Sequence, residues 1–367
     1  MTNDPTPVVS VIVPARNEEA SLAACLQSLI AQTGIDYEII VVDDDSTDRT
    51  PEIARSFTRA HVGADVRPAV HLICAPQLPA NWTGKNNAMA AGAKIAKGKW
   101  VLFTDADTVH KPGSMARAAA EAEEHGADLL SYSPEQEVRT FWEKAVMPVI
   151  FAELAATYPP QAVNDPASPI AAANGQYLMI SREAYDAVGG HTTIAADLLE
   201  DVAMARLVKS SGRKIFFRYG GDAVRTRMYR SWARMKEGWT KNLALLFPRP
   251  RILALLRMAE FLLILGNLSA AIWAKFSGRP NLALQTALLT IILSGWFAIR
   301  IRKAHFSHTA NLLAIGGLPI FVYLLVLSTR LHRSHSVTWK GRKYGNVPAR
   351  AMTRESPHTS SAGAASG

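Results

Sequence analysis

The chain has 367 residues, enough for one large domain or for a catalytic domain with an appendage. Apolar residues make up 49% of it and charged residues only 19%, and the mean hydropathy of +0.04 is high for a soluble enzyme. Residues 1–201 carry 14 basic against 27 acidic residues, a net charge of −13, whereas residues 202–367 carry 26 against 4, a net charge of +22. Apolar runs interrupt the basic half. Its charge therefore predicts a membrane surface as partner and argues against nucleic acid, which usually needs a continuous basic patch.

Two features of the chain bear on its cellular compartment. The two cysteines, Cys25 and Cys74, each lie in an apolar run and are expected to be buried thiols, which excludes a disulfide framework and a cysteine-based metal site. The first seven residues are polar and lack the apolar segment of a signal peptide. We therefore expect the N-terminal half to lie in the cytoplasm.

The first hundred residues alternate between short β-branched runs and amphipathic stretches. Strands are expected at 8–13, 37–42, 71–74 and 99–104, and helices at 18–31, 50–60 and 85–96. Further along, strands are expected at 127–133, 176–180 and 214–219, helices at 141–157, 182–188 and 195–210, and a loop at 161–170. Pro148 is expected to end or kink the helix at 141–157. Strands separated by helices predict an α/β fold with a mostly parallel sheet covered on both faces, whose ligands bind beyond the carboxyl ends of the strands.

Polar and acidic residues follow three of these strands. They are Pro14, Arg16 and Glu18 after the first strand, Asp43, Asp44 and Asp45 after the second, and Asp105 and Asp107 after the strand at 99–104. Because parallel strands end at one edge of a sheet, the three groups should converge.

Asp105 and Asp107 are candidate metal ligands. Two carboxylates separated by one residue can reach one cation, and Mg²⁺ and Mn²⁺ favour carboxylate oxygens together with substrate phosphates. Such a cation would stabilise the charge on a departing diphosphate. The alternative is a chance pair of aspartates in an acidic loop.

The group Asp43–Asp45 has two interpretations. It is either a solvated turn before the helix at 50–60, with Asp48 as the helix cap, or a nucleoside site in which a carboxylate accepts from a base or a ribose hydroxyl. Lys85, which opens the helix at 85–96, is either a phosphate-binding ammonium at a helix N-terminus or a surface lysine.

Glu200 and Asp201 are expected inside the helix at 195–210. One of them could face the cleft and act as the general base that an acceptor hydroxyl requires, or both could be surface carboxylates. His191 follows two glycines and is either a cleft residue or an exposed loop residue.

The basic half contains a candidate interfacial helix at 229–247. Trp232, Met235, Trp239, Leu243 and Leu246 share one face, with basic residues on the others. This pattern is typical of a helix lying in a membrane interface, and the alternative is an ordinary helix packed on the core.

Three apolar stretches follow, at 252–274, 281–299 and 309–329. They are long enough to cross ~30 Å of hydrocarbon at ~1.5 Å per residue, although the first contains Arg257 and Glu260. Basic residues follow both the second and the third stretch, and the preference for basic loops in the cytoplasm conflicts with three simple spans. Either one stretch is interfacial or re-entrant, or the preference is broken. The tail from 355 is expected to be disordered.

Five segments in a fixed order resemble the family 2 glycosyltransferases with the GT-A fold. They are residues 10–19, 38–50, 84–108, 174–191 and 198–212, and the resemblance covers about residues 8–247. Residues 81–85, 229–242 and 337–344 also look like the membrane-bound transferases of hopanoid and carotenoid lipid pathways. The resemblance implies a GT-A catalytic domain at 1–228, an amphipathic interfacial helix at 229–250, a membrane region at 251–330 and a basic, then disordered, tail at 331–367.

The resemblance also implies roles for individual residues. Asp44, with Asp43, would bind the nucleotide base, and Glu18 would lie beside the nucleoside, within a donor site that includes Pro14, Arg16 and Lys85. Asp105 and Asp107 would hold nucleotide and metal, and Asp201 would be the base of an inverting transfer. Gly175, Gln176 and Tyr177 would border the sugar or acceptor, with Glu200 and His191 as further acceptor-site candidates.

Three departures qualify the resemblance. Asp45 replaces the family's usual glycine, the Gln-x-x-Arg-Trp motif of processive synthases is absent, and no apolar segment precedes the catalytic half. The sequence therefore predicts an inverting transferase at the cytoplasmic face of the inner membrane that moves one sugar from a nucleotide diphosphate-sugar to a lipid or lipid-linked acceptor. The alternatives are a polyprenyl-phosphate glycosyltransferase, a short polysaccharide synthase, a catalytically silent nucleotide-binding membrane protein and a nucleotidyltransferase.

Overall fold

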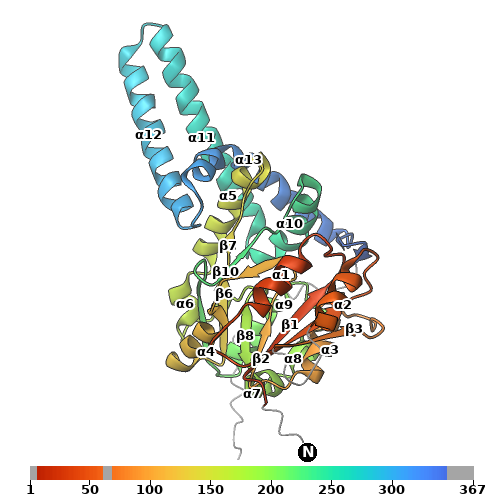
Figure 1. The fold of residues 1–367 in the computed structure, drawn as a ribbon. Coiled ribbons are helices and arrows are strands. Elements are labelled where there is room, and N and C mark those ends of the chain that lie inside the picture. The colour runs from red at the N-terminus through yellow and green to blue at the C-terminus, as the bar shows by residue number, and fades with distance from the viewer. Residues whose placement is uncertain (1–5, 61–67, 345–367) are drawn as a thin grey trace, which may run out of the picture.

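The computed structural model describes residues 6–60 and 68–344, so the predicted disorder of the tail from 355 lies outside the described residues. The described chain forms an α/β body from which two long helices project as a hairpin (Figure 1).

A seven-stranded sheet in the order β3-β2-β1-β4-β8-β6-β9 is the centre of the body. Its strands are β1 (Val9–Ala15), β2 (Tyr37–Asp43), β3 (Ala69–Cys74), β4 (Trp100–Phe103), β6 (Leu129–Ser133), β8 (Leu178–Ser181) and β9 (Ile215–Tyr219). Only β8 runs antiparallel to its neighbours. Within β1, Val11 and Val13 pack into the core on one face and Ile12 into the core on the other, as expected for a sheet covered on both sides. The predicted mostly parallel α/β sheet is confirmed.

Helices cover both faces of this sheet. They are α1 (Leu22–Ile30), α2 (Thr50–Ala60), α3 (Gly84–Ile95), α4 (Ser114–Glu124), α7 (Arg182–Ala187), α8 (Gly190–Thr193) and α9 (Glu200–Ser210). A small sheet of β5 (Thr108–His110), β10 (Val224–Thr226) and β7 (Glu135–Gln136) lies beyond the carboxyl end of β4. Gly92 lets α3 approach β1 closely, since a Cβ there would lie 2.6 Å from a methyl of Ile12.

Four local predictions differ from the structure. α9 begins at Glu200, five residues later than predicted, because the Asn86 amide donates to the carbonyl oxygens of Ile194, Ala195 and Asp197 and holds that backbone outside the helix. Part of the predicted loop at 161–170 is the short helix α6 (Pro160–Asn164). Pro148 lies inside α5 (Phe141–Thr157), so it does not end the helix, and the kink stays a prediction. Cys74 is exposed, whereas Cys25 is buried as predicted.

A second hydrophobic core joins α5 to two helices of the C-terminal half, α10 (Trp232–Leu246) and α13 (His308–Arg333). Gly317 of α13 leaves no room for a Cβ against the Ala145 carbonyl of α5, so the two helices are in close contact. The Trp239 indole donates to the sulfur of Met147 at 3.4 Å. The apolar face of α10 is thus buried against protein. The position of α10 in a membrane interface stays a prediction, and only the exposed face of the helix would be available to contact the membrane.

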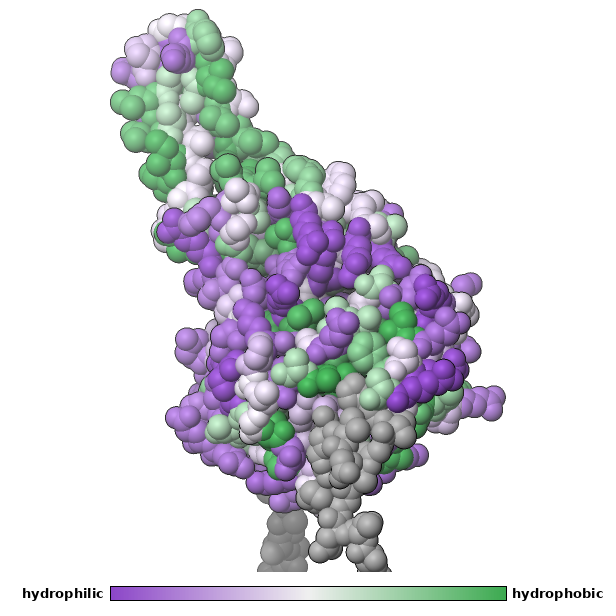
Figure 2. Space-filling model, in the orientation of Figure 1, coloured by the Kyte–Doolittle hydropathy of each residue, from purple (hydrophilic) through white to green (hydrophobic). Residues whose placement is uncertain are grey.

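α11 (Pro250–Phe276) and α12 (Pro280–Arg302) form the projecting hairpin. α11, α12 and α13 are each long and apolar enough to cross a membrane. Of the most apolar 18 residues in each helix, 11% are buried in α11 and 6% in α12, compared with 39% in α13. Figure 2 shows the hydrophobic surface of this hairpin. Lys275 and Arg279 lie at the turn between the two helices. At the base of the hairpin, Arg257 and Arg300 each pair with Glu260 at 2.7 Å and with Glu153 of α5 at 3.0 and 3.3 Å. The exposed apolar surface of the three long helices therefore belongs mainly to α11 and α12.

The chain touches the α/β body both before and after α13. His305, just before α13, stacks on Tyr219 of β9 with ring centroids 4.1 Å apart. After α13, a small hairpin of β11 (Thr338–Trp339) and β12 (Arg342–Lys343) lies against the ends of β1 and β2. This arrangement favours the interfacial or re-entrant alternative for the third apolar stretch over a simple span.

Candidate active site

A cavity of about 890 Å³ opens at the carboxyl ends of β1, β2 and β4. The predicted site residues that line it are Pro14, Arg16, Glu18, Asp44, Lys85, Asp105, Asp107, Gly175, Gln176, Glu200 and Asp201. They come from strand ends and helix starts that are far apart in the sequence, as the convergence of strand ends predicted.

The end of the cavity beside β1 and β2 is shaped by Arg16. Its guanidinium donates to the backbone carbonyl oxygens of Asp44 (2.5 Å) and Asp45 (2.9 Å), which fixes the loop after β2. Asp45 has a φ of +57°, a left-handed conformation that glycine adopts freely and that aspartate tolerates better than most residues. Asp45, the departure noted in the sequence, therefore adopts a conformation that a glycine would accept without strain.

The C-terminal hairpin brings two cations to this end. Lys340 pairs with a Glu18 carboxylate oxygen at 2.5 Å, and the Arg342 guanidinium donates to both carboxylate oxygens of Asp44, at 2.5 and 3.1 Å. We call this end, with Glu18, Asp44, Lys340 and Arg342, the donor end. Its carboxylates and cations are already paired, so an anionic ligand would have to exchange partners with them.

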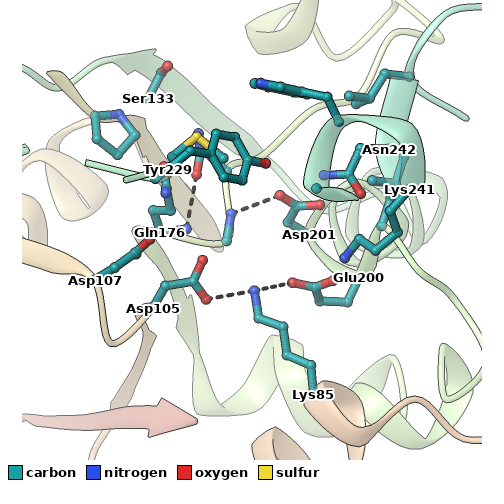
Figure 3. Close-up of a pocket in the computed structure, with 18 of the residues that line it drawn as sticks. Lys85, Asp105, Asp107, Ser133, Gln176, Glu200, Asp201, Tyr229, Lys241 and Asn242 are labelled. Atoms are coloured by element: carbon teal, nitrogen blue, oxygen red, sulfur yellow. Dashed lines mark hydrogen bonds and ion pairs between the residues drawn. The ribbon is translucent and has the colours of Figure 1, made fainter. Parts of the chain in front are cut away.

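Lys85 connects two carboxylates in the middle of the cavity (Figure 3). Its ammonium lies 2.7 Å from Asp105 and 2.5 Å from Glu200. Burial disfavours the charge on Lys85, but Asp105 and Glu200 outweigh burial and raise its pKa. Burial also opposes ionisation of Glu200, yet the neighbouring ammonium lowers the pKa of that carboxyl. Lys85 therefore stays charged at the start of α3, where a helix N-terminus also favours an anion.

Asp107 is a partly buried carboxylate beside other acidic groups. Burial, and then the charges of Asp105 and Glu18, raise the pKa of Asp107 well above its ordinary value. Its Oδ1 is buried without a hydrogen-bond partner, a costly state that a bound cation would relieve. Among residues 6–60 and 68–344, no three His, Cys, Asp or Glu side chains are placed to hold an ion by themselves. The donor set thus suits a hard divalent cation that keeps water or substrate oxygens as further ligands.

Asp201 is held in the first turn of α9 and faces the cavity (Figure 3). One carboxylate oxygen accepts from the Gly175 N–H at 2.9 Å and the other from the Val202 N–H at 2.8 Å. Burial, followed by the charge of Glu200, raises the pKa of Asp201 to about 6. A carboxylate with a pKa near neutrality can take a proton from an acceptor at physiological pH.

Three predicted residues do not line the cavity. Asp43 is buried at the end of β2, where its carbonyl accepts from the Ala75 N–H. Tyr177 is fully buried and donates to the Ser114 carbonyl, because residues along the strand alternate faces and its side chain points into the core. His191 is buried against the Tyr185 hydroxyl at 2.9 Å, and burial lowers its pKa to about 3. The acceptor-site positions expected for Tyr177 and His191 are corrected accordingly.

Several cavity residues were not among the predicted site residues. They are Tyr229, Lys241, Asn242, Trp339, Lys340 and Arg342. The Lys241 ammonium lies 5.3 Å from the Trp339 ring centroid, and burial lowers its pKa. Their segments, 229–242 and 337–344, carried motifs, but a motif of basic and aromatic residues does not reveal which strand ends it will contact.

The chain is similar to known glycosyltransferases. Residues 10–189 match the family model described as Glycosyl transferase family 2. A 4,4'-diaponeurosporenoate glycosyltransferase of Staphylococcus aureus (strain MRSA252) is 26% identical over 350 residues, which cover 92% of this chain and 88% of the relative. The range matched by the family model, residues 10–189, contains Glu18, Asp44, Lys85, Asp105 and Asp107. Asp201 lies beyond that range.

Two solved structures are also similar. The mannosyltransferase PcManGT from Pyrobaculum calidifontis, in complex with GDP-Man and Mn²⁺, is 18% identical, with 89% of this chain and 87% of that chain covered and a TM-score of 0.48. S. aureus TarS 1-349 in complex with UDP-GlcNAc is 16% identical, with 88% and 91% covered and a TM-score of 0.40.

Proposed function

We propose that this chain, a family 2 glycosyltransferase with the GT-A fold, moves one sugar from a nucleotide diphosphate-sugar to a lipid or lipid-linked acceptor with inversion at the sugar carbon. One observation supports this most strongly: Asp201, with its raised pKa, shares a cavity with the carboxylates of Asp105 and Asp107. A base and a site for a leaving diphosphate in one enclosed space are what a single displacement requires.

Asp201 is the proposed base. As the acceptor oxygen forms its bond to the sugar carbon, its proton passes to the Asp201 carboxylate, and the bond from that carbon to the diphosphate breaks. The backbone N–H groups of Gly175 and Val202 hold this carboxylate in place. A positioned base of this kind contributes about 10²- to 10⁴-fold to the rate.

The cations of the cavity are assigned to the leaving diphosphate. Lys85, Lys340 and Arg342 would meet its charge, while Asp44 and Glu18, once released from the hairpin, would accept from the nucleoside. A charge-assisted hydrogen bond of this type contributes roughly 1.5–3 kcal/mol. Pro14 and Arg16 shape the wall against which the nucleoside lies.

Asp107, with Asp105, would hold a divalent cation, Mg²⁺ or Mn²⁺. Such a cation supplies charge stabilisation to a leaving diphosphate when it is bound. The partnerless oxygen of Asp107 supports this assignment.

The acceptor and the membrane belong together. The S. aureus relative is named for a carotenoid acid, a lipid-like acceptor, and this chain carries a long apolar hairpin beside its cavity. We propose a catalytic domain at 1–228 in the cytoplasm, α11 and α12 embedded in the inner membrane within the region 251–330, and the helix at 229–250 at the interface. Gln176, Gly175 and Glu200 would border the transferred sugar.

The test uses purified full-length protein in lipid nanodiscs. UDP-glucose, UDP-GlcNAc and GDP-mannose, each with Mn²⁺ or Mg²⁺, are compared by thermal shift, because a bound ligand raises the melting temperature. The preferred donor, as a radiolabelled sugar, is then incubated with bacterial lipid extract. A single labelled sugar on a lipid supports the proposal, a ladder of lengths would show a polymer synthase, and binding without transfer would show a silent nucleotide-binding protein.

A further inference from the structure

The cavity continues beyond Asp201, away from the donor end, and its chemistry changes there. The wall is built from apolar and aromatic side chains of α5, the segment before α6, and β9, namely Phe151, Leu154, Ala155, Tyr158, Phe217 and Tyr219. We call this the apolar end. It borders the proposed base, because Tyr158 and Asp201 line the same cavity. Burial, and to a smaller extent the charge of Asp201, raise the pKa of Tyr158 to about 12 against the opposing charge of Arg206.

The loop between α12 and α13 closes the apolar end. Ala304 and His305 of this loop line the cavity. The His305 ring stacks on Tyr219 with an angle of 11° between the planes, and Phe306 packs against Phe151 with centroids 5.8 Å apart. The segment that leaves the apolar hairpin is therefore also a wall of the cavity.

The exposed apolar surface of α12 reaches almost to this wall. Trp296 is 72% exposed and Ile299 is 63% exposed. Lys303, just after α12, also lines the cavity. Ile299 lies four residues before it, which is about 6 Å along a helix at ~1.5 Å per residue. An apolar surface of this extent in a helix of this length is suited to hydrocarbon. Figure 2 shows the hydrophobic hairpin joining the body beside more polar surface.

We propose that the apolar end binds the hydrocarbon chain of the acceptor, which enters from the membrane beneath the α12–α13 loop and brings its terminal oxygen to Asp201. This inference rests on the proposed function, because it names the acceptor's path into the same site. The cavity of about 890 Å³ must also hold the donor, so only the reactive end of the acceptor and a short stretch of chain fit inside. The remainder stays in the membrane alongside α12. The acceptor is accordingly a slender apolar chain with its reactive oxygen at one end.

Two neighbouring alanines of α5 give a matched pair of variants. Ala155 lines the apolar end, whereas Ala156 is exposed to solvent. Ala155→Phe places a ring in the path of the chain, and Ala156→Phe adds the same ring outside it. Phe217→Trp, on the opposite wall, narrows the path independently of α5.

The probe is palmitic acid carrying a photoreactive diazirine at the middle of its chain, added to full-length protein in phosphatidylcholine nanodiscs. After irradiation, labelled peptides are identified by mass spectrometry. We expect labelling of residues 151–158 in the wild type, at least a fivefold loss in Ala155→Phe and in Phe217→Trp, and wild-type labelling in Ala156→Phe. Labelling of the exposed face of α12 is the internal standard and should be equal in all four proteins.

Labels confined to the exposed faces of α11 and α12, or equal labelling of 151–158 in the wild type and both blocking variants, would overturn the inference. Thermal shift with nucleotide-sugars on the wild type tests the proposed function separately. Selective labelling without nucleotide-sugar binding would remove the transferase proposal and leave a lipid site, whereas the opposite result would leave the transferase with another acceptor path.

Discussion

The two ends of one cavity differ in how they are built. The donor end is crowded with charge: Glu18 and Asp44 already pair with Lys340 and Arg342, and Asp107 is left with a partnerless oxygen. The apolar end has aromatic walls and is closed by a loop that leaves the projecting hairpin of α11 and α12. Asp201 lies between them. Under the proposed function, a water-soluble, anionic donor and an apolar acceptor would reach Asp201 from opposite sides.

The largest expected effect comes from removing the proposed base, Asp201, which lies between the two ends. Asp201→Asn should lower kcat by about 10³-fold, within the range for a positioned general base, because an amide cannot take the acceptor proton. The fold should survive, since the amide oxygen still accepts from the Gly175 N–H. Turnover at saturating substrates is the measurement, with circular dichroism as the check on folding. A kcat within threefold of the wild type would remove Asp201 from this role.

The next variant acts on the donor end alone. Asp107→Asn removes a proposed metal ligand and should abolish the effect of Mn²⁺ on nucleotide affinity, a loss of roughly 100-fold in the presence of the metal. Calorimetric titration of UDP or GDP with and without Mn²⁺ gives the result. Asp186→Asn, on the exposed face of α7, is the control for loss of a carboxylate. Equal Mn²⁺ dependence in Asp107→Asn and the wild type would contradict the assignment.

Two variants in the β11–β12 hairpin test the role of the donor end. Lys340→Ala and Arg342→Ala should each raise the KM for the donor about tenfold, since each removes one charge-assisted contact to a diphosphate. Lys343→Ala, an exposed residue of the same hairpin, should leave KM unchanged. If instead the hairpin only blocks the site, both variants would lower KM, and the proposed contacts to the donor would be wrong.

The pH dependence tests which acceptor oxygen meets Asp201. A base with a pKa of about 6 is ionised above that pH and protonated below it. The rate of transfer to a hydroxyl should therefore fall about tenfold per pH unit below pH 6 and level off above it. A carboxylate acceptor is already ionised and needs no base, so a rate that stays flat from pH 7 to 5 would indicate that class of acceptor.

The two cysteines report on the side of the membrane. Cys74 is exposed on β3, whereas Cys25 is buried and burial raises its pKa to about 12, which makes it unreactive. A membrane-impermeant maleimide should label inverted inner-membrane vesicles and leave intact spheroplasts unlabelled. Cys74→Ser should abolish the signal. Labelling of spheroplasts would place the catalytic body outside the cytoplasm.

Much of the fold could be predicted because its signals are local. Strand and helix periods in residues 8–104 placed β1, β2, β4, α2 and α3 within a few residues, and the rule that parallel strands end at one edge brought Glu18, Asp44, Asp105 and Asp107 together in advance. Boundaries failed where a distant side chain intervened, as the Asn86 amide does before α9. The direction of a strand residue also needs its register, which is why Tyr177 was misplaced.

The sequence by itself therefore determined the α/β sheet, the acidic strand ends and the three apolar helices, because each depends on neighbours along the chain. Only the tertiary structure decided that α13 packs on α5 while α11 and α12 stay exposed, and that Lys340 and Arg342 reach carboxylates some 300 residues away. An apolar helix has the same composition whether it faces lipid or protein. The sequence around a basic residue likewise does not show which carboxylate it will contact. Contacts between distant segments therefore cannot be predicted from local patterns.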